Sequence, residues 1–422
     1  MKNLTSFIKN YQTLVDHGKK LEQTIEELIS FLEKHNFQGW EPYDIPEFKN
    51  WLIPQSIRVL LTQLIRLSPV FIHPYFKSKD THAKAATLFA RAFLILFELT
   101  NKQKYYEKAV YFLDWLKAHR CPTTKNFSSG TQYQLSMKNY SANPGTPAPL
   151  ITCFAIEAFL SGYEISKNQR FLELAESGVN YFLDELPQIK VANDQSYFIY
   201  HPNNSQFIPN SPAVISGTLS RFYSISKNEK LLTIVKNNLN YIMSYQREDG
   251  SWFYHPKSRY IDSFHTAFIL EALLKFHHYV RDNSFEKQFL KGLSYYEQTF
   301  FKSDMQPTHK KRFGSPTNVD SFLTRIDLRD IAMGLVLFSQ STSLRTDLIK
   351  RVLNLSNWCV KHFRSNEGYF YYQKVPLYTI KGPFLSMQAW MLYGLSMLLK
   401  VLNNYEQNQV TKYEKEAVKT IK

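Results

Sequence analysis

Two short segments of the chain combine carboxylates with a base or with guanidinium groups where an apolar helix is expected to begin. The first is segment 260–265 (YIDSFH), in which Asp262 and His265 are three residues apart. On a helix this spacing places both side chains on one face. We expect Asp262 to cap the helix and to orient His265 as a proton donor or acceptor. The alternative is a structural cap beside a structural imidazole.

The second segment, 325–330 (RIDLRD), holds two guanidinium groups and two carboxylates. Arg325 and Arg329 could bind a uronate, while Asp327 and Asp330 could supply an acid and a base. A capping and salt-bridge network at a helix start explains the same residues. The spacing alone leaves open which carboxylates converge.

Other residues on the loops that enter apolar helices extend this candidate site. His82 follows Asp80 at the first apolar helix and partly repeats the Asp262–His265 pattern. The remaining candidates for binding a sugar are Tyr260, Trp252, Tyr254, Tyr371, Tyr372 and Gln388. Aromatic rings can stack on a sugar or fill the core, and core packing is the favoured interpretation for Trp252.

Two glutamates, Glu157 and Glu271, lie within apolar helices. A carboxylate in such a place needs either an ionic partner or a wet cavity. A polar channel is one explanation, and pairing with Arg91 or Arg221 is the other.

The three cysteines and the N-terminus indicate a reduced, cytoplasmic protein without a metal or cofactor. The cysteines (Cys121, Cys153 and Cys359) are widely spaced, and the zinc spacings CxxC and HxE are missing from the sequence. The first twenty residues lack the apolar run of a signal peptide. No segment has about 18 uninterrupted apolar residues, so we expect no transmembrane helix.

Composition and charge narrow the class of partner. Hydrophobic residues make up 44% of the chain and aromatic residues 15%, which supplies a large core and argues against disorder. The net charge of +15 suits an anionic partner such as an acidic polysaccharide. The basic residues do not form a recognised nucleic-acid motif, so a nucleic-acid partner is not expected.

An internal repeat organises the chain. Tyr111, Tyr181, Tyr241, Tyr295 and Trp358 occupy matching positions in five segments, at separations of 70, 60, 54 and 63 residues. Each unit consists of an apolar helix, a tight polar turn, an amphipathic helix and a longer aromatic loop.

This pattern predicts an all-α fold, an (α/α)6 toroid of helical hairpins. Helices that are apolar on all faces must be buried, so they form the inner ring, and the amphipathic helices form the outer ring. An open α-solenoid is the competing architecture, but its concave face would be more polar. We expect a helical N-terminal extension packed on the ring (1–80), the toroid (81–404) and a charged C-terminal tail (405–422).

One motif resembles the QW motif of the squalene-cyclase α/α toroids, in which it is structural. It comprises Tyr241, Ile242, Gln246, Gly250 and Trp252. We expect the glycine to supply a turn with positive φ and the tryptophan to stack on the helix end. Triterpene cyclisation is not expected, because segment 325–330 does not match the acidic cluster of that family.

A second resemblance covers most of the chain. The matching segments are 39–45 (GWEPYDI), 246–254 (QREDGSWFY), 260–273 (YIDSFHTAFILEAL), 368–373 (GYFYYQ) and 387–398 (MQAWMLYGLSML). They resemble a family encoded in bacterial capsule and exopolysaccharide gene clusters, which is itself similar to uronyl hydrolases, lyases and epimerases. The resemblance implies a role in surface-polysaccharide biosynthesis or modification, alongside other polysaccharide-assembly proteins.

Three functions therefore remain at this stage. The first is acid–base catalysis of hydrolase, lyase or epimerase type on a glycan bound in the central cavity. The second is a non-catalytic scaffold or glycan-binding module, which is favoured by departures from the family pattern at 130–138 and 382–387. The third and most remote is a terpenoid or prenyl enzyme.

Overall fold

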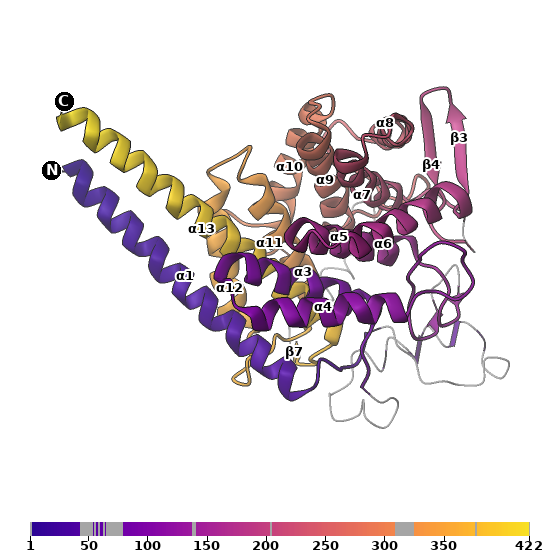
Figure 1. Ribbon diagram of the computed structural model, residues 1–422, viewed down its shortest axis with the longest axis horizontal. Helices are drawn as coiled ribbons and strands as arrows, with labels where there is room; N and C mark the ends of the chain where they lie inside the picture. The colour runs from indigo at the N-terminus through magenta and orange to yellow at the C-terminus, as the bar shows by residue number, and fades with distance from the viewer. Residues whose placement is uncertain are drawn as a thin grey trace.

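The computed structural model describes residues 2–42, 54, 56–57, 60–61, 64, 79–136, 141–202, 205–308, 325–375 and 378–421. Within these residues, helices dominate (Figure 1), and their contacts arrange them in two concentric rings. The prediction of an all-α toroid of helical hairpins is confirmed.

The inner ring is made of the helices that the sequence marks as apolar on all faces. Each packs against the next along the chain, and the last returns to the first, so the ring is closed. In order these helices are α3 (Ala83–Thr100), α5 (Pro149–Ser166), α7 (Asn210–Ser226), α9 (Ser263–Lys275), α11 (Leu328–Ser341) and α13 (Leu385–Ile421).

The outer ring is made of the amphipathic helices, each packed on the inner helix that precedes it. They are α4 (Gln103–Ala118), α6 (Gln169–Asn180), α8 (Glu229–Met243), α10 (Glu286–Phe300) and α12 (Leu348–Phe363). Two single-turn π-helices, η2 (Tyr181–Glu185) and η3 (Phe276–Val280), extend α6 and α9.

The N-terminal helix α1 (Lys2–Lys34) supplies the sixth outer helix, because it packs on α13. Two equivalent glycines show this. Gly250 has φ +91° after α8, and a Cβ there would lie 2.6 Å from the Lys291 carbonyl oxygen of α10. Gly368 has the same φ after α12, and its Cβ would lie 2.6 Å from the Glu27 carbonyl oxygen of α1. The positive φ expected for Gly250 is confirmed. The domain boundaries at 80/81 and 404/405 stay a prediction.

Helices α1 and α13 run antiparallel, and their far ends project together from the ring beside both chain termini (Figure 1). Segment 385–407 of α13 is long and apolar enough to cross a membrane, but 83% of its most apolar window is buried inside the protein. That burial is typical of the core helix of a soluble protein.

The inner helices α3, α5 and α7 end at the polar turns of the repeat with the same backbone conformation. Asn101, Lys167 and Lys227 adopt left-handed φ values of 53°, 55° and 54°, and each backbone amide donates to the carbonyl four residues earlier. The side chains of Asn168 and Asn228 then cap α6 and α8. These local caps make each hairpin tight.

The loops contain short antiparallel strands. Strands β1 (Leu135–Ser136) and β2 (Ser141–Ala142) pair with each other, as do β3 (Gln188–Ala192) and β4 (Gln195–Phe198). Strand β6 (Gln373–Lys374) lies between β5 (Ile326–Asp327) and β7 (Thr379–Ile380). This last sheet ties the loop that enters α13 to the start of α11.

Candidate functional site

The first predicted pair lies at the start of α9, as expected. Asp262 is the N-cap, and its carboxylate accepts the backbone N–H of His265 at 2.7 Å. The same carboxylate lies 2.6 Å from His265 Nδ1. Both side chains remain partly accessible, at 16% for Asp262 and 27% for His265. The aspartate therefore holds the helix end and the imidazole at once.

Burial tends to raise the pKa of Asp262, but His265 and the Arg329 guanidinium hold it at about 2. An ionised Asp262 accepts a hydrogen bond from the Nδ1–H of His265. His265 Nε2 is then the atom that exchanges a proton with a ligand. The ring of Tyr254 lies against His265 with centroids 4.7 Å apart. Tyr254 contacts Tyr260 in turn, at 6.0 Å.

The second predicted group lies at the start of α11. Asp327 caps this helix by accepting the Arg329 backbone N–H at 2.9 Å, and it accepts the Gln373 side-chain amide at 2.7 Å. Asp327 is thus engaged in holding β5, β6 and α11 together. Burial and the neighbouring carboxylate of Asp327 raise the pKa of Asp330 well above its usual range, against the opposing effect of Arg329. Asp330 keeps its proton to higher pH than an ordinary carboxyl group.

The fold brings these two groups together. The Arg329 guanidinium lies 4.2 Å from the centre of the Phe264 ring, which adjoins His265. Arg329 lowers the pKa of Asp262, and Asp262 in turn raises that of Asp330. The Asp262–His265 pair and the residues Arg329 and Asp330 therefore lie at the starts of neighbouring inner helices, close enough for Asp262 to interact electrostatically with both Arg329 and Asp330.

Solved structures of sugar-processing enzymes share this architecture. D-mannose isomerase matches with a TM-score of 0.60 and 12% identity over 90% of this chain and 97% of its own. Cellobiose 2-epimerase from Bacillus thermoamylovorans gives 0.57 and 12% over 75% and 87%. The GH76 α-mannanase of Bacteroides thetaiotaomicron gives 0.56 and 11% over 76% and 88%. The chain has the α/α-toroid fold of these enzymes. No family model and no curated protein matches it.

Three residues that the sequence offers as sugar-binding candidates are buried inside the toroid. Trp252 is 2% exposed, and its indole N–H donates to the Ile242 carbonyl at 3.2 Å. Gln388 is fully buried, and its amide both accepts from and donates to the Phe370 backbone at 2.8 Å. Tyr372 is 1% exposed. Core packing, the favoured interpretation for Trp252, is confirmed, whereas Gln388 and Tyr372 were expected to bind a sugar and are buried in the fold instead.

The other predicted residues occupy the loops around the same mouth. Arg325 is exposed just before α11. Tyr371 is partly buried after α12, with Lys381 Nζ 5.7 Å from its ring centre. His82, the N-cap residue of α3, is 3% exposed and lies edge-on to Tyr133 at 5.4 Å. Neither ring nitrogen of His82 has a hydrogen-bond partner among the described residues.

Sequence reasoning missed two polar groups beside this site. Asn210 is the first residue of α7 and 2% exposed, and it lines a small space of about 10 Å³ with Asp262 and His265. Its side-chain amide lacks a partner among the described residues, and so does the indole N–H of the buried Trp390. Buried polar atoms are nearly always satisfied, so these point to water or a ligand. Alignment of the inner-helix starts across the repeat could have singled out Asn210.

Sequence reasoning also missed a cap made by the N-terminal segment. The Glu41 carboxylate is 4% exposed and accepts the Ser386 backbone N–H at 2.8 Å and the Ser386 hydroxyl at 2.6 Å. The start of α13 is therefore held from a distant part of the chain, and no local signal marks it.

The centre of the toroid is filled rather than open. Phe154, Phe268 and Trp390 are each the sixth residue of their inner helix, and their rings meet with centroids 5.6 to 6.1 Å apart. We call these three rings the aromatic plug. It lies between the two mouths, so the single central cavity expected from the sequence is divided.

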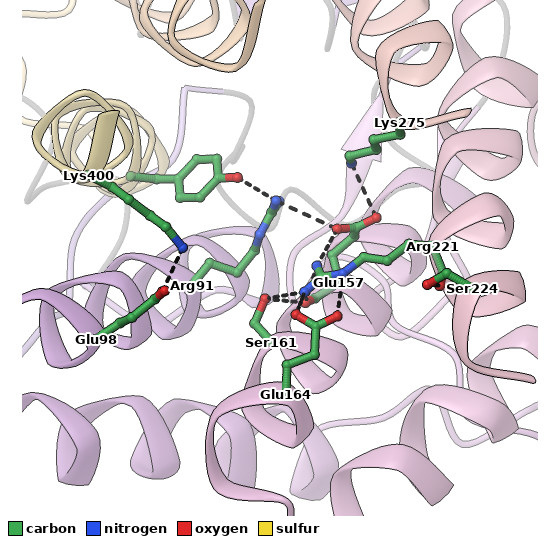
Figure 2. A network of polar contacts seen from close by, with 10 residues as sticks. Arg91, Glu98, Glu157, Ser161, Glu164, Arg221, Ser224, Lys275 and Lys400 are labelled. Carbon is green, nitrogen blue, oxygen red and sulfur yellow. Dashed lines mark hydrogen bonds and ion pairs between the residues drawn. The ribbon is translucent and has the colours of Figure 1, made fainter. Parts of the chain in front are cut away.

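The larger space lies beyond the plug, at the mouth formed by the C-terminal ends of the inner helices. This distal cavity measures about 1040 Å³. Its floor is a network of charged side chains centred on Glu157, which is 1% exposed (Figure 2). Glu157 lies 2.7 Å from Arg221, 3.2 Å from Lys275 and 3.7 Å from Arg91. Both alternatives for Glu157 thus hold: it is paired, and it borders a cavity.

This network joins most of the inner ring. The Arg221 side chain also bonds Glu164 at 2.6 Å, and Lys275 lies 3.1 Å from Glu271. Burial tends to raise the pKa of Glu157, but Lys275, Arg221 and Arg91 lower it to about 2. The ions therefore link α3, α5, α7 and α9. Among the described residues no cluster of three or more histidine, cysteine or acidic side chains could hold a metal.

Proposed function

We propose that the mouth at the N-terminal ends of α9 and α11 binds a glycan and carries out acid–base chemistry on it. The observation that carries this proposal is the electrostatic link between two groups at the starts of α9 and α11. Ionised Asp262 holds His265 at 2.6 Å, and the charge of Asp262 helps to raise the pKa of Asp330. Acid–base catalysis requires two groups of opposite protonation state at one place. Arg329, which lowers the pKa of Asp262, suits the carboxylate of a uronate.

In this mechanism, His265 Nε2 accepts a proton from a sugar carbon, a hydroxyl group or a water molecule. Asp262 stabilises the resulting imidazolium through Nδ1–H and stays ionised. Asp330 donates a proton to the leaving oxygen or to the opposite face of the sugar. One proton is taken up and one is released, so the step is balanced for a hydrolase, lyase or epimerase. Arg329 neutralises the negative charge that develops between them.

Three features support a carbohydrate substrate. D-mannose isomerase, cellobiose 2-epimerase and an α-mannanase share the fold, and the net charge of +15 favours an acidic glycan. The resemblance of several segments to capsule and exopolysaccharide proteins supports a role in surface-polysaccharide assembly, and we propose that the reaction takes place in the cytoplasm. Other assembly proteins are then the natural partners.

The test is turnover of uronate-containing oligosaccharides and nucleotide sugars, followed by reducing ends, by ultraviolet absorbance of unsaturated products and by proton NMR for epimers. His265→Gln and Asp330→Asn should each lower the rate by about 10²–10⁴. His119→Gln is the matched control, since His119 is exposed at the end of the outer helix α4 and stacks on Trp115. Equal rates for wild type and both site variants would refute the proposal.

The second candidate is a glycan-binding module without catalysis. The observation in its favour is the small space beside His265, about 10 Å³ within the described residues. A glycan that raises the melting temperature of wild type but is never converted would support this candidate. Loss of that shift in His265→Gln would place the glycan at the same mouth.

A further inference from the structure

The distal cavity carries a surplus of positive side chains. Its lining includes the pair Lys400 and Glu98, 2.6 Å apart, and the Arg221 side chain shared by Glu157 and Glu164. In total five cations and three anions line it: Arg91, Arg221, Lys275, Arg281 and Lys400 against Glu98, Glu157 and Glu164. Glu271, which pairs with Lys275, lies outside the lining but reduces the surplus. The cavity is large enough for a small molecule and retains net positive charge.

Arg91 is a buried cation of this cavity that keeps donors for a ligand. Its Nη2 donates to the Tyr393 hydroxyl, and its guanidinium lies 4.3 Å from the centre of that ring. Its distance to Glu157, 3.7 Å, is too long for a hydrogen bond. A guanidinium has five N–H donors, so most of them are not used by the described residues. The side chain is only 7% exposed, so water and salt screen an ion pair there only weakly.

The position of Arg91 decides where an anion would sit. The C-terminal ends of the inner helices carry partial negative charge at the rim of this mouth. Arg91 is the ninth residue of α3, is 7% exposed and lines the cavity beside Glu157 (Figure 2). An oxyanion is therefore favoured deep in the cavity, away from the carbonyl groups at the rim.

The remaining walls suit hydroxyl groups and a sugar face. Tyr279 and Tyr405 supply aromatic rings, while Gln340 and Asn404 supply neutral donors and acceptors. Such a mixture of rings and neutral polar groups is typical of small-molecule sites that orient a polar ligand.

We propose that the distal cavity is a second ligand site, which binds an acidic monosaccharide or a sugar phosphate with its oxyanion on Arg91. This site is separate from the acid–base mouth, because the aromatic plug lies between them. Either oxyanion, carboxylate or phosphate, satisfies the same guanidinium geometry.

The test is calorimetric titration of the full chain with glucuronate, glucose 1-phosphate, glucose and inorganic phosphate. At least one of the acidic sugars should bind at one site per chain, about tenfold or more tighter than glucose or inorganic phosphate. Arg91→Gln should weaken that binding about tenfold or more, and Arg91→Lys should weaken it less. Arg170→Gln is the matched control, since Arg170 pairs with Asp114 on the outer ring at 3.2 Å.

Tyr393→Phe is a second variant that keeps the proposal testable if the Arg91 variants fail to fold. It removes the hydroxyl that occupies Arg91 Nη2 and keeps the aromatic ring. Binding should persist or tighten in this variant. No binding of either acidic sugar, equal binding by glucose or inorganic phosphate, or unchanged binding in Arg91→Gln would overturn the proposal. His265→Gln should leave this binding intact, so failure here is distinguishable from failure of the acid–base mouth. Loss of binding in His265→Gln alone would also overturn it.

Discussion

Replacing Glu157 with glutamine tests whether the ion network holds the inner ring together. The side chain keeps its size and one hydrogen-bond acceptor, so the perturbation is the loss of one buried negative charge. The positive charges of Arg221, Lys275 and Arg91 then lie close together with less negative charge to balance them. We expect Glu157→Gln to destabilise the folded protein strongly.

Two estimates of the magnitude agree. The pKa of Glu157 is about 2 in the folded chain against an ordinary 4.5. At about 1.4 kcal/mol per pKa unit, this shift corresponds to roughly 3 kcal/mol. Removing one partner of a buried ion pair costs about 3–5 kcal/mol in general. For a chain of this length, roughly 3 kcal/mol lowers the melting temperature by about 3–4 °C.

The effect should depend on pH with a defined sign. Because the folded pKa lies below the ordinary value, the stabilisation is complete above about pH 4.5 and is lost as the pH falls toward 2. Scanning calorimetry of wild type and Glu157→Gln at pH 7 and pH 3 measures this difference. At pH 3 roughly half or less of the difference should remain.

The matched control is Glu164→Gln. Glu164 bonds the same Arg221 at 2.6 Å, but its side chain is 42% exposed. Solvent-exposed ion pairs contribute about 1 kcal/mol or less, so this variant should melt within about 1 °C of wild type. If Glu157→Gln melts like wild type at pH 7, or if both variants lose the same stability, burial does not set the strength of the network and the reasoning is refuted.

Three further substitutions test single features of the ring. Gly250→Ala should lower the free energy of unfolding by about 1–3 kcal/mol, because φ is +91° and a Cβ would lie 2.6 Å from a carbonyl oxygen of α10. A melting temperature equal to that of wild type would contradict this. Gln388→Leu should lower it by about 2–4 kcal/mol, since two buried backbone groups of Phe370 lose their partner, as urea denaturation would show. Asp262→Ala should be about 1 kcal/mol less stable than Asp262→Asn in the same assay, because asparagine still caps the helix, although both lose the carboxylate that holds His265.

Local features of this fold could be predicted from sequence because their causes lie within a few residues. Apolar helices followed by amphipathic ones, the turns at Lys167 and Lys227, and the cap at Asp262 depend on neighbours three or four positions away. The positive φ of Gly250 follows from the same kind of local signal. These features were enough to predict the toroid.

Roles of individual side chains were less predictable. Gln388 lies in the first turn of α13 and was expected to bind a sugar, yet it is buried and bonded to the backbone of Phe370. Whether an aromatic or amide side chain turns outward depends on space left by other helices. The electrostatic interaction of Asp330 with Asp262 likewise needed the packing of α11 beside α9.

By itself, the sequence determined the helical hairpins, their inner and outer faces and the polar residues at the helix starts, because hydrophobic period and capping act locally. Only the tertiary structure decided how the ring closes, since Glu27 of α1 pairs with Arg364 at the far end of the chain. It also decided that an aromatic plug separates two mouths, and that Arg91 meets Tyr393 above it. These contacts join residues hundreds of positions apart, and their energies exist only once the whole ring has packed.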